Sequence, residues 1–246
     1  MKRGTIVVGA SGDIGRAIAL ALHTTGRRLF LTHSGLGSFN ADDYSPLLDD
    51  DSRLKWATMN LLDKASVESA ITQASLFLEA EYDLVVASGI VRDAPMMMMR
   101  DDLWDDVIAT NLTGVFRCLR TAARDMTVAG SGNIVLLGST GARVGNPGQG
   151  AYAASKAGLE ALCRVAAVEL GRFGIAVNVV APGPTESRMF RDVPMKTVER
   201  AITATPTRRL TRPEEVAEMV VALISQDAGS LTGQTIVIDG GMTIAP

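Results

Sequence analysis

Tyr152 and Lys156 are the residues of this sequence whose types and spacing most directly suggest chemistry. They stand four positions apart, so in a helix both side chains leave on the same face. A tyrosine phenol has a pKa near about 10, and a nearby ammonium favours the phenolate, which moves that pKa toward neutrality. Such a pair can transfer a proton at physiological pH. A surface tyrosine beside a solvated lysine is the alternative, but small residues surround the pair, so another molecule could approach this helix closely.

A serine and a glycine-rich turn follow apolar runs, at positions where open α/β sheets bind ligands. Ser139 comes after the run Ile134–Leu137, where its hydroxyl could hydrogen-bond a carbonyl oxygen, or where it is an ordinary loop serine. The turn Gly9–Gly15 follows the run Thr5–Val8 and opens a helical pattern, so its backbone N–H groups and the helix dipole favour a diphosphate. Its glycines are spaced three apart and do not match G-x-G-x-x-G, which leaves a tight structural turn as the alternative.

Short apolar runs alternate with amphipathic segments along the whole chain. Such runs predict strands buried on both faces, which pair in parallel and carry helices on both sides of the sheet. We therefore predict a single doubly wound, Rossmann-like α/β domain over residues 1–246, with about seven parallel strands. The expected strands are Thr5–Val8, Leu29–Thr32, Leu54–Met59, Leu84–Ala87, Ile134–Leu137, Ala176–Val180 and Thr235–Ile238. The expected helices are Ile14–Thr25, Lys64–Ala80, Leu103–Val128 (which can divide near Asn111), Tyr152–Arg172, a less regular one ending near Thr203, and Pro213–Ser225.

The composition is that of an ordinary globular protein and argues against several other classes. Of 246 residues, 47% are hydrophobic and 21% charged, which disfavours disorder, collagen and coiled coil. The 24 Lys and Arg against 27 Asp and Glu give a net charge of −3, so no basic excess is available for nucleic acid. No apolar run reaches the roughly 18 residues of a membrane span. His23, His33, Cys118 and Cys163 suit neither a metal site nor a disulfide framework, so we expect buried thiols and a cytoplasmic protein.

The sequence resembles the short-chain dehydrogenase/reductase family over essentially all of Lys2–Ile244. The resemblance rests on motifs in the family's order and spacing: Gly9…Gly15, Asn111-Leu-Thr-Gly114, Ser139, Tyr152-Ala-Ala-Ser-Lys156, Val177-Asn-Val-Val-Ala-Pro-Gly183, and Leu231-Thr-Gly-Gln with Ile238-Asp-Gly-Gly241. Within the family it is most similar to 3-oxoacyl-[acyl-carrier-protein] reductases, through Gly89-Ile-Val-Arg-Asp93, the methionines after it and the closing motif.

The resemblance implies that the protein uses NADPH to reduce a ketone, in the first place the 3-oxo group of an acyl-carrier-protein thioester. Tyr152 would protonate the carbonyl oxygen, and Lys156 would lower the Tyr152 pKa and hydrogen-bond the nicotinamide ribose. Ser139 would orient the carbonyl, and Asn111 would hold a water that connects Lys156 to solvent. The other cofactor-binding residues implied are Gly9, Ser11, Gly12, Asp13, Ile14, Gly15, Ser34, Asn60, Leu61, Ser88, Gly89, Pro182, Gly183 and Thr185.

The resemblance also implies a homotetramer, joined through the helices Asn111–Val128 and Tyr152–Arg172. An acidic carrier protein would dock on a locally positive surface. Arg120 and Arg124, four residues apart, and Arg172 are the candidates for it. The alternative is a solvated basic face that offsets helix dipoles.

Three features depart from the family's pattern: the glycine turn, in which Val8 replaces a threonine, the stretch Val86–Gly89, and the loop His33–Asp51, which lacks the basic residues often found after the second strand. Asp13 stands where the family's turn has its middle glycine, and a carboxylate beside a diphosphate is repulsive. We expect Asp13 to cap the helix beginning at Ile14 instead, with its oxygens turned to backbone N–H groups. Val86-Ala-Ser-Gly89 replaces the family's Asn-Asn-Ala-Gly, so Ser88 or apolar packing must take over from two amides.

The end of the second strand favours NADPH over NADH. NAD-preferring relatives place an acid there to bind the ribose 2′-OH, whereas this chain has His33 and Ser34 and no acid until Asp42. The missing acid removes repulsion toward a 2′-phosphate, to which Ser34 could donate; otherwise both residues are merely loop. The run Met96–Met99 is either a surface loop or a flexible apolar lip on a substrate pocket.

Two other functions stay open at this point. One is a reductase of the same chemistry that acts on a different small ketone or alcohol, in secondary or sugar metabolism. Assays of a carrier-bound 3-oxoacyl chain against free ketones would separate the two. The other is a non-catalytic nucleotide-binding protein, which would bind the cofactor without turnover.

Overall fold

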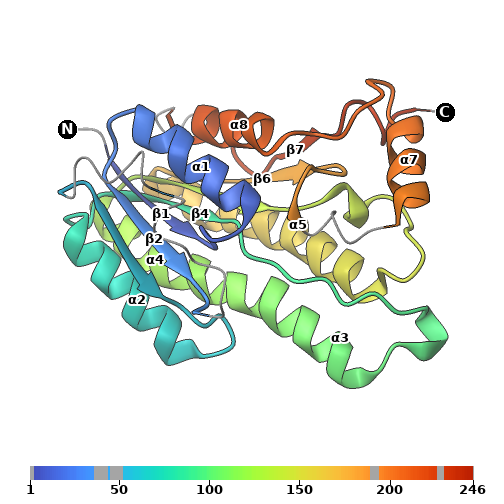
Figure 1. Cartoon of the computed structure of the whole chain (residues 1–246). Coiled ribbons are helices and arrows are strands. Elements are labelled where there is room, and N and C mark those ends of the chain that lie inside the picture. Colours follow the sequence, from blue (N-terminus) through green and yellow to red (C-terminus); the bar gives the residue numbers. More distant parts are fainter. Residues whose placement is uncertain (1–2, 36–43, 45–51, 189–193, 226–229, 246) are drawn as a thin grey trace.

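The structure, a computed structural model, describes residues 3–35, 44, 52–188, 194–225 and 230–245. Its centre is a seven-stranded parallel sheet with helices on both faces (Figure 1), in the order β3-β2-β1-β4-β5-β6-β7. The strands are β1 Gly4–Val8, β2 Leu29–His33, β3 Leu54–Thr58, β4 Tyr82–Val86, β5 Gly132–Leu137, β6 Ile175–Pro182 and β7 Thr235–Ile238. The doubly wound α/β fold expected from the sequence is confirmed, with strand ends that differ by at most two residues.

The helices also follow the predicted pattern. They are α1 Asp13–Thr24, α2 Lys64–Phe77, α3 Asp101–Ile108, α4 Val115–Ala129, α5 Gly150–Leu170, α7 Met195–Ala204 and α8 Pro213–Ser225. The predicted helix Lys64–Ala80 ends earlier, because Glu79 and Ala80 take left-handed φ angles of 59° and 58° before β4. Most of the predicted loop His33–Asp51, with Asp42, and residues 189–193 before α7 lie outside the described residues.

Alternate residues of each strand contribute to two hydrophobic clusters on opposite faces of the sheet. In β1, Ile6 and Val8 belong to the cluster beneath α2, α4 and α5, whereas Val7 belongs to the cluster beneath α1 and α8. In β4, Leu84 and Val85 divide in the same way. This period of two covers both faces with helices (Figure 1) and leaves the edge at the strands' carboxyl ends for a site.

The strand order reverses between β1 and β4, which are neighbours in the sheet. Connections leave such a point toward opposite faces, and a crevice for ligands remains at the carboxyl ends of the two strands. Gly9 follows β1 and Ser88 follows β4, and a β-carbon on Gly9 would lie 2.3 Å from Ser88 Oγ. Ser88 therefore packs against Gly9 at the place where the family's amides were missing from the sequence.

The predicted helix Leu103–Val128 is divided near Asn111, as the sequence allowed. The division is a π-helical turn, Ala109–Gly114, between α3 and α4. Gly114 lets this turn approach the loop after β3, because a β-carbon on it would lie 2.7 Å from Leu61 Cβ. Such turns re-aim side chains and recur at functional sites; here the turn carries the fully buried Asn111.

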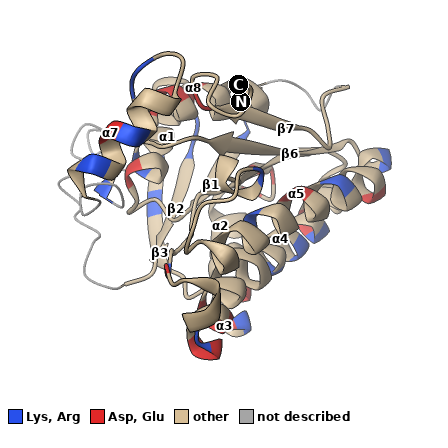
Figure 2. Cartoon of the chain, turned by 90° about the vertical axis from the view of Figure 1, so that its right-hand side faces the viewer, with Lys and Arg blue, Asp and Glu red and all other residues tan. Residues whose placement is uncertain are grey.

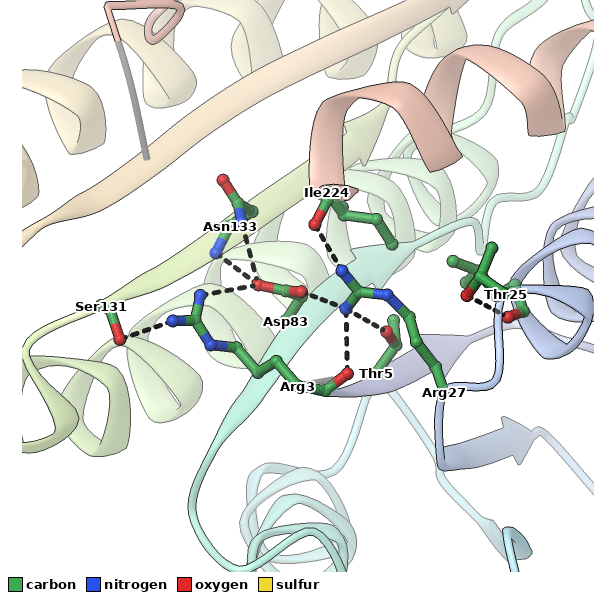
Figure 3. A network of polar contacts seen from close by, with 9 residues as sticks. Arg3, Thr5, Thr25, Arg27, Asp83, Ser131, Asn133 and Ile224 are labelled. Atoms are coloured by element: carbon green, nitrogen blue, oxygen red, sulfur yellow. Dashed lines mark hydrogen bonds and ion pairs between the residues drawn. The ribbon is translucent and has the colours of Figure 1, made fainter. Parts of the chain in front are cut away.

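A network of buried charges joins the amino ends of the strands (Figure 3). The fully buried Asp83 carboxylate in β4 accepts a hydrogen bond from Arg27 Nη1 at 2.5 Å and another from the Asn133 N–H at 2.8 Å. Arg27 Nη2 donates to the Ile224 carbonyl in α8 at 2.6 Å, and Arg3 Nη2 donates to a serine after α4 at 2.7 Å. The network ties β4 to β5 and to α8, so it supports the scaffold at the edge opposite the predicted site.

In the described part of the chain, no helix is long and apolar enough to cross a membrane. The same residues contain no group of three or more His, Cys, Asp or Glu side chains that could hold a metal ion.

The buried network generates a prediction about stability. We expect Arg27→Met to lower the free energy of unfolding by about 3–5 kcal/mol, because it removes the nearest cation from the buried Asp83 carboxylate. Urea denaturation at neutral pH measures the change. The control is Arg28→Gln, which breaks a pair with the largely exposed Glu79 and should cost about 1 kcal/mol or less. Equal losses for the two variants would show that the buried pair contributes no more than a surface pair.

Candidate active site

Four predicted catalytic residues come together at the carboxyl edge of β5. The Ser139 hydroxyl hydrogen-bonds the Tyr152 phenol, and Lys156 Nζ lies 5.7 Å from the centre of the Tyr152 ring. A β-carbon on Gly89 would lie 3.4 Å from Lys156 Nζ and 3.5 Å from Asn111 Oδ1, so these two side chains converge beside the loop after β4. The structure thus brings Asn111 to the same place as the serine, tyrosine and lysine, although three different segments carry them.

Ser139 is oriented by the short helical turn that follows β5. Its backbone is extended, and its Oγ accepts a hydrogen bond from the Gly141 N–H at 3.0 Å. That bond uses an acceptor site and leaves the hydroxyl hydrogen free to donate to Tyr152. A β-carbon on Gly141 would lie 3.3 Å from Ser139 Oγ and 3.5 Å from Tyr152 Cε1, so a larger residue would crowd the pair.

Asn111 fixes the loop after β4 against the π-helical turn. Its Oδ1 accepts from the Ile90 N–H at 2.8 Å, and its Nδ2 donates to the Ile90 carbonyl at 2.9 Å. Nδ2 also contacts Ser155 Oγ in α5 at 3.3 Å. The amide therefore links three segments around Lys156, and its role toward a water molecule stays a prediction.

Lys156 carries its charge into the interior beside β5. The side chain is almost fully buried, and Nζ donates to the Leu137 carbonyl at 2.6 Å. A carbonyl oxygen stabilises an ammonium less than a carboxylate does, and burial lowers the Lys156 pKa to about 8. Such an ammonium keeps unused donors near Gly89 and Asn111, where hydroxyl groups of a ligand could accept them.

The partly buried Tyr152 phenol retains its proton. Burial raises its pKa above the ordinary value; the hydrogen bond with Ser139 opposes this effect and the Asp93 carboxylate adds to it. Lys156 is not among the groups that shift this pKa, so the expectation that Lys156 moves the Tyr152 pKa toward neutrality stays a prediction. Lys156 Nζ lies over the ring and donates to the Leu137 carbonyl. Its hydrogen bond is therefore made to a carbonyl oxygen and not to the phenol oxygen. A protonated phenol in this position can act as an acid.

The backbone geometry of the turn Gly9–Gly15 is suited to binding an anion. Gly9 has a φ of +83°, and a β-carbon on Gly15 would lie 2.2 Å from the Gly9 carbonyl oxygen. A larger residue at either position would therefore strain or clash with this tight turn. Gly12 is the N-cap of α1 and supplies no side-chain capping bond. The first turn of α1 consequently offers backbone N–H groups and a positive dipole end at the β1 edge, which fits a diphosphate.

Asp13 does not cap α1, contrary to the expectation. It is the first residue of the helix, because Gly12 occupies the capping position. Its carboxylate instead accepts from the Arg188 backbone N–H at 2.5 Å and pairs with Arg188 Nε at 3.2 Å. Arg188 also donates from Nη2 to the Ser11 carbonyl. Sequence reasoning missed Arg188, since it lies 175 residues from Asp13 and no local pattern connects the two.

The other predicted cofactor-binding residues share one edge of the sheet. Ser11 and Ile14 follow β1, Ser34 follows β2, Asn60 and Leu61 follow β3, Ser88 and Gly89 follow β4, and Gly183 and Thr185 follow β6, which ends at Pro182. Parallel strands place their carboxyl ends on the same side, which explains this grouping. Asn60 is exposed and its Oδ1 accepts from the Leu62 N–H at 3.0 Å, whereas Thr185 is buried and bonds to the Gly183 carbonyl at 2.9 Å.

The loop that follows β4 packs against the start of α5. The Ala94 N–H donates to the Gly148 carbonyl at 3.0 Å, and a β-carbon on Gly150 would lie 3.1 Å from Met96 Cε. Burial raises the pKa of Asp93, and that side chain hydrogen-bonds Gln149. Sequence reasoning did not assign a role to Asp93, although its carboxylate acts on the Tyr152 phenol. Its signal in the sequence was its place at the end of the motif Gly89-Ile-Val-Arg-Asp93.

A cavity of about 490 Å³ lies apart from these residues, between α1, α7 and α8. Its lining includes Asp13, Leu20, Glu186, Val198 and Glu214. It contains none of the four catalytic candidates, so we assign the chemistry to the edge of β5 and not to this cavity.

Comparison with known proteins supports the same interpretation. A family profile described as enoyl-(acyl carrier protein) reductase matches residues 9–243. The 3-oxoacyl-[acyl-carrier-protein] reductase of Salmonella typhimurium is 38% identical over 242 residues, which cover 96% of each chain, and that of Staphylococcus aureus (strain Mu50) is 36% identical over 98% of each chain. The crystal structure of an actinorhodin polyketide ketoreductase variant with NADPH superposes with a TM-score of 0.91 at 29% identity, covering 98% of this chain and 97% of that one.

The burial of Lys156 predicts how stability depends on pH. Its pKa is about 8 in the folded protein, below the ordinary 10.5, so between these values the unfolded state binds more protons. This group therefore increases the free energy of unfolding as pH rises, by at most about 1.4 kcal/mol per pH unit. Relative to Lys156→Met, the wild type should gain stability in urea denaturation between about pH 8 and 10. A difference that stays constant or falls would contradict the burial of this ammonium.

Proposed function

The chain belongs to the short-chain dehydrogenase/reductase family, and we propose that it uses NADPH to reduce the 3-oxo group of an acyl-carrier-protein thioester to a secondary alcohol. It is an oxidoreductase that acts on hydroxyl and keto groups. The observation that carries the proposal is the convergence of Ser139, Tyr152 and Lys156 at the carboxyl edge of β5. Similarity over nearly the whole chain to 3-oxoacyl reductases and a polyketide ketoreductase supports a substrate from fatty-acid or polyketide synthesis.

Tyr152 is the general acid in this proposal. The phenol is protonated near neutral pH, so it has a proton to donate to the oxygen of a keto group that is being reduced. Ser139, fixed by the Gly141 N–H, directs its hydroxyl to the same point and orients the carbonyl. Asn111 holds the loop at Ile90 and so keeps this space open beside Lys156.

The edge of the sheet provides the cofactor site. When bound, a nicotinamide cofactor supplies the hydride that reduces the keto carbon. The uncapped first turn of α1 would bind the diphosphate. Lys156 donates to the Leu137 carbonyl and would use a remaining donor for the ribose next to the nicotinamide. Pro182 and Gly183 border the nicotinamide, and Asn60 and Leu61 lie on the adenine side.

The residues after β2 support a preference for NADPH. Ser34 is exposed directly after β2, so its hydroxyl can reach a ribose 2′-phosphate. His33 Nδ1 accepts from the Gly35 N–H at 3.1 Å, which assigns the ring proton to Nε2. Burial lowers the His33 pKa, so the ring is a neutral donor at physiological pH.

Met96, Met97 and Met98 lie beside the start of α5, where they could contact an apolar substrate. Their side chains are 73%, 98% and 72% exposed, and Met96 lies against Gly150, two residues before Tyr152. Exposed methionines adapt to variable apolar shapes. In this proposal they form the lip that receives an acyl chain.

We also propose a homotetramer joined through α4 and α5. Phe116 in α4 and Val165 and Val168 in α5 are exposed apolar side chains, 38%, 53% and 83% accessible, on the helices concerned. Arg172 follows α5, about 30 Å along the helix from Tyr152. A carrier docked on Arg120, Arg124 and Arg172 would therefore serve this site only if a neighbouring copy brought the patch to it.

Tyr152→Phe tests the acid. The change removes the donor and little volume, so kcat should fall at least about 100-fold while the cofactor still binds. Tyr82→Phe is the matched control, because Tyr82 is a buried phenol that donates to Asp125 at 2.8 Å, at the amino end of β4. It should lose stability but keep its kcat. A Tyr152→Phe enzyme with more than about a tenth of wild-type kcat would refute the assignment.

Ser34→Asp tests the cofactor preference. The wild type should show a higher kcat/KM with NADPH than with NADH, and the new carboxylate should reverse that order by repelling the 2′-phosphate. Ser69→Asp adds the same charge in α2 and should leave the order unchanged. Equal kcat/KM values for the two cofactors in the wild type would count against this assignment of the β2 end.

The substrate class is tested by comparing a carrier-bound 3-oxoacyl chain with a short thioester mimic and free ketones. Replacement of Arg120, Arg124 and Arg172 together by Ala should raise KM for the carrier-bound substrate, and added salt should do the same to the wild type. KM for the short mimic should change little. If neither substitution nor salt moves KM, there is no basic docking patch, and a small free ketone becomes the better substrate assignment.

A further inference from the structure

The ion pair between Asp13 and Arg188 joins the glycine turn to the segment that follows β6. Arg188 makes three contacts there: its backbone N–H and its Nε bind the Asp13 carboxylate, at 2.5 Å and 3.2 Å, and its Nη2 donates to the Ser11 carbonyl. Both partners of the guanidinium therefore belong to the turn Gly9–Gly15. The contact brings an arginine to the place where the proposed function puts the cofactor diphosphate.

Asp13 creates an electrostatic problem at this place. Its carboxylate stands in the first turn of α1, where it benefits from the helix dipole but repels a second anion. The turn Gly9–Gly15 contains no Lys or Arg of its own. Within the turn, only backbone N–H groups are available to bind a doubly charged diphosphate next to a carboxylate.

Arg188 is suited to solve this problem. A guanidinium has five N–H donors in a planar fork, and the contacts with Asp13 and Ser11 engage Nε and Nη2. Its side chain is 46% exposed, so part of the fork faces solvent beside the turn and can be reached by a ligand. The two contacts also restrict the long side chain, which lowers the entropy lost when it binds a phosphate.

We propose that Arg188, positioned by Asp13, binds the diphosphate of the nicotinamide cofactor and supplies the positive charge that the glycine turn lacks. This inference rests on the proposed function, since it assumes that a nicotinamide dinucleotide binds at the β1 edge. The inference gives a role to Asp13, which stands where the family's turn has a glycine. The Asp13 carboxylate holds in place the Arg188 guanidinium, which comes from a distant segment of the chain.

Two other roles for the pair give different results. Arg188 could merely neutralise Asp13, in which case removing both charges would restore binding. The pair could also hold the segment after β6 without touching the cofactor, in which case stability would change and cofactor affinity would not. The diphosphate is common to NADPH and NADH, so direct binding by Arg188 affects both nucleotides equally.

The experiment measures the dissociation constants of NADPH and of NADH without substrate, by calorimetry, for the wild type, Arg188→Gln, Asp13→Asn and the double variant. We expect Arg188→Gln to weaken binding of both nucleotides about 10- to 100-fold, as for loss of one charge-assisted hydrogen bond. A smaller loss should separate the double variant from Asp13→Asn, because the arginine is no longer positioned by the carboxylate. Wild-type affinity should fall with added salt more steeply than that of Arg188→Gln. Arg28→Gln, which breaks an exposed ion pair at the amino end of β2, should bind like the wild type.

Three results would overturn the inference. They are wild-type affinity in Arg188→Gln, full recovery of affinity in the double variant, and a loss confined to NADPH. If Arg188→Gln does not fold, Arg188→Lys keeps the charge without the fork and should still weaken both nucleotides; wild-type affinity in that variant would overturn the proposal. A wild type that binds neither nucleotide would instead refute the proposed function itself, so the two failures are distinguishable.

Discussion

Burial of the Lys156 ammonium is the constraint on which the rest of the site depends. A charge placed this deeply needs a partner, and the structure gives it the Leu137 carbonyl at the end of β5. That bond fixes where α5 lies against the sheet edge and therefore where Tyr152, one helical turn earlier, presents its phenol. Because a carbonyl satisfies only part of the ammonium, donors remain for hydroxyl groups of a ligand. The cost of burial appears in the lowered Lys156 pKa.

The two ends of the sheet handle charge in opposite ways. At the amino edge, Asp83 and Arg27 are buried, and backbone groups from β5 and α8 complete their hydrogen bonds, so the network stabilises one arrangement of the strands. At the carboxyl edge, Asp13 and Arg188 are partly exposed to solvent. A satisfied buried network suits a scaffold, whereas an exposed pair next to an uncapped helix end can still interact with a ligand. Figure 2 shows that charged residues also occur along α3, α5 and α7.

Small residues make the convergence possible. Gly89 lies beside Lys156 and Asn111, and Gly141 lies beside Ser139 and Tyr152, where a β-carbon would come within 3.3 Å of Ser139 Oγ. The π-helical turn between α3 and α4 aims Asn111 at the loop after β4, where two hydrogen bonds to Ile90 hold that loop in place. The site is therefore built by backbone geometry first, and its polar side chains are tied to backbone groups.

The sequence by itself determined the alternation of strands and helices, the edge of the sheet that holds the site, and the residues gathered there. These follow from local patterns: runs of buried strands, the glycines after β1, and the spacing of Tyr152 and Lys156. Only the tertiary structure decided the electrostatics. The Tyr152 pKa depends on how far the packing of α5 buries the phenol and on which oxygen accepts the hydrogen bond from Lys156 Nζ. The spacing of the two residues in the sequence determines neither. Asp13 resembled a helix cap in sequence, but its partner comes from a segment 175 residues away. Burial and charge pairing depend on groups that are distant along the chain, and no local pattern records which of them will meet.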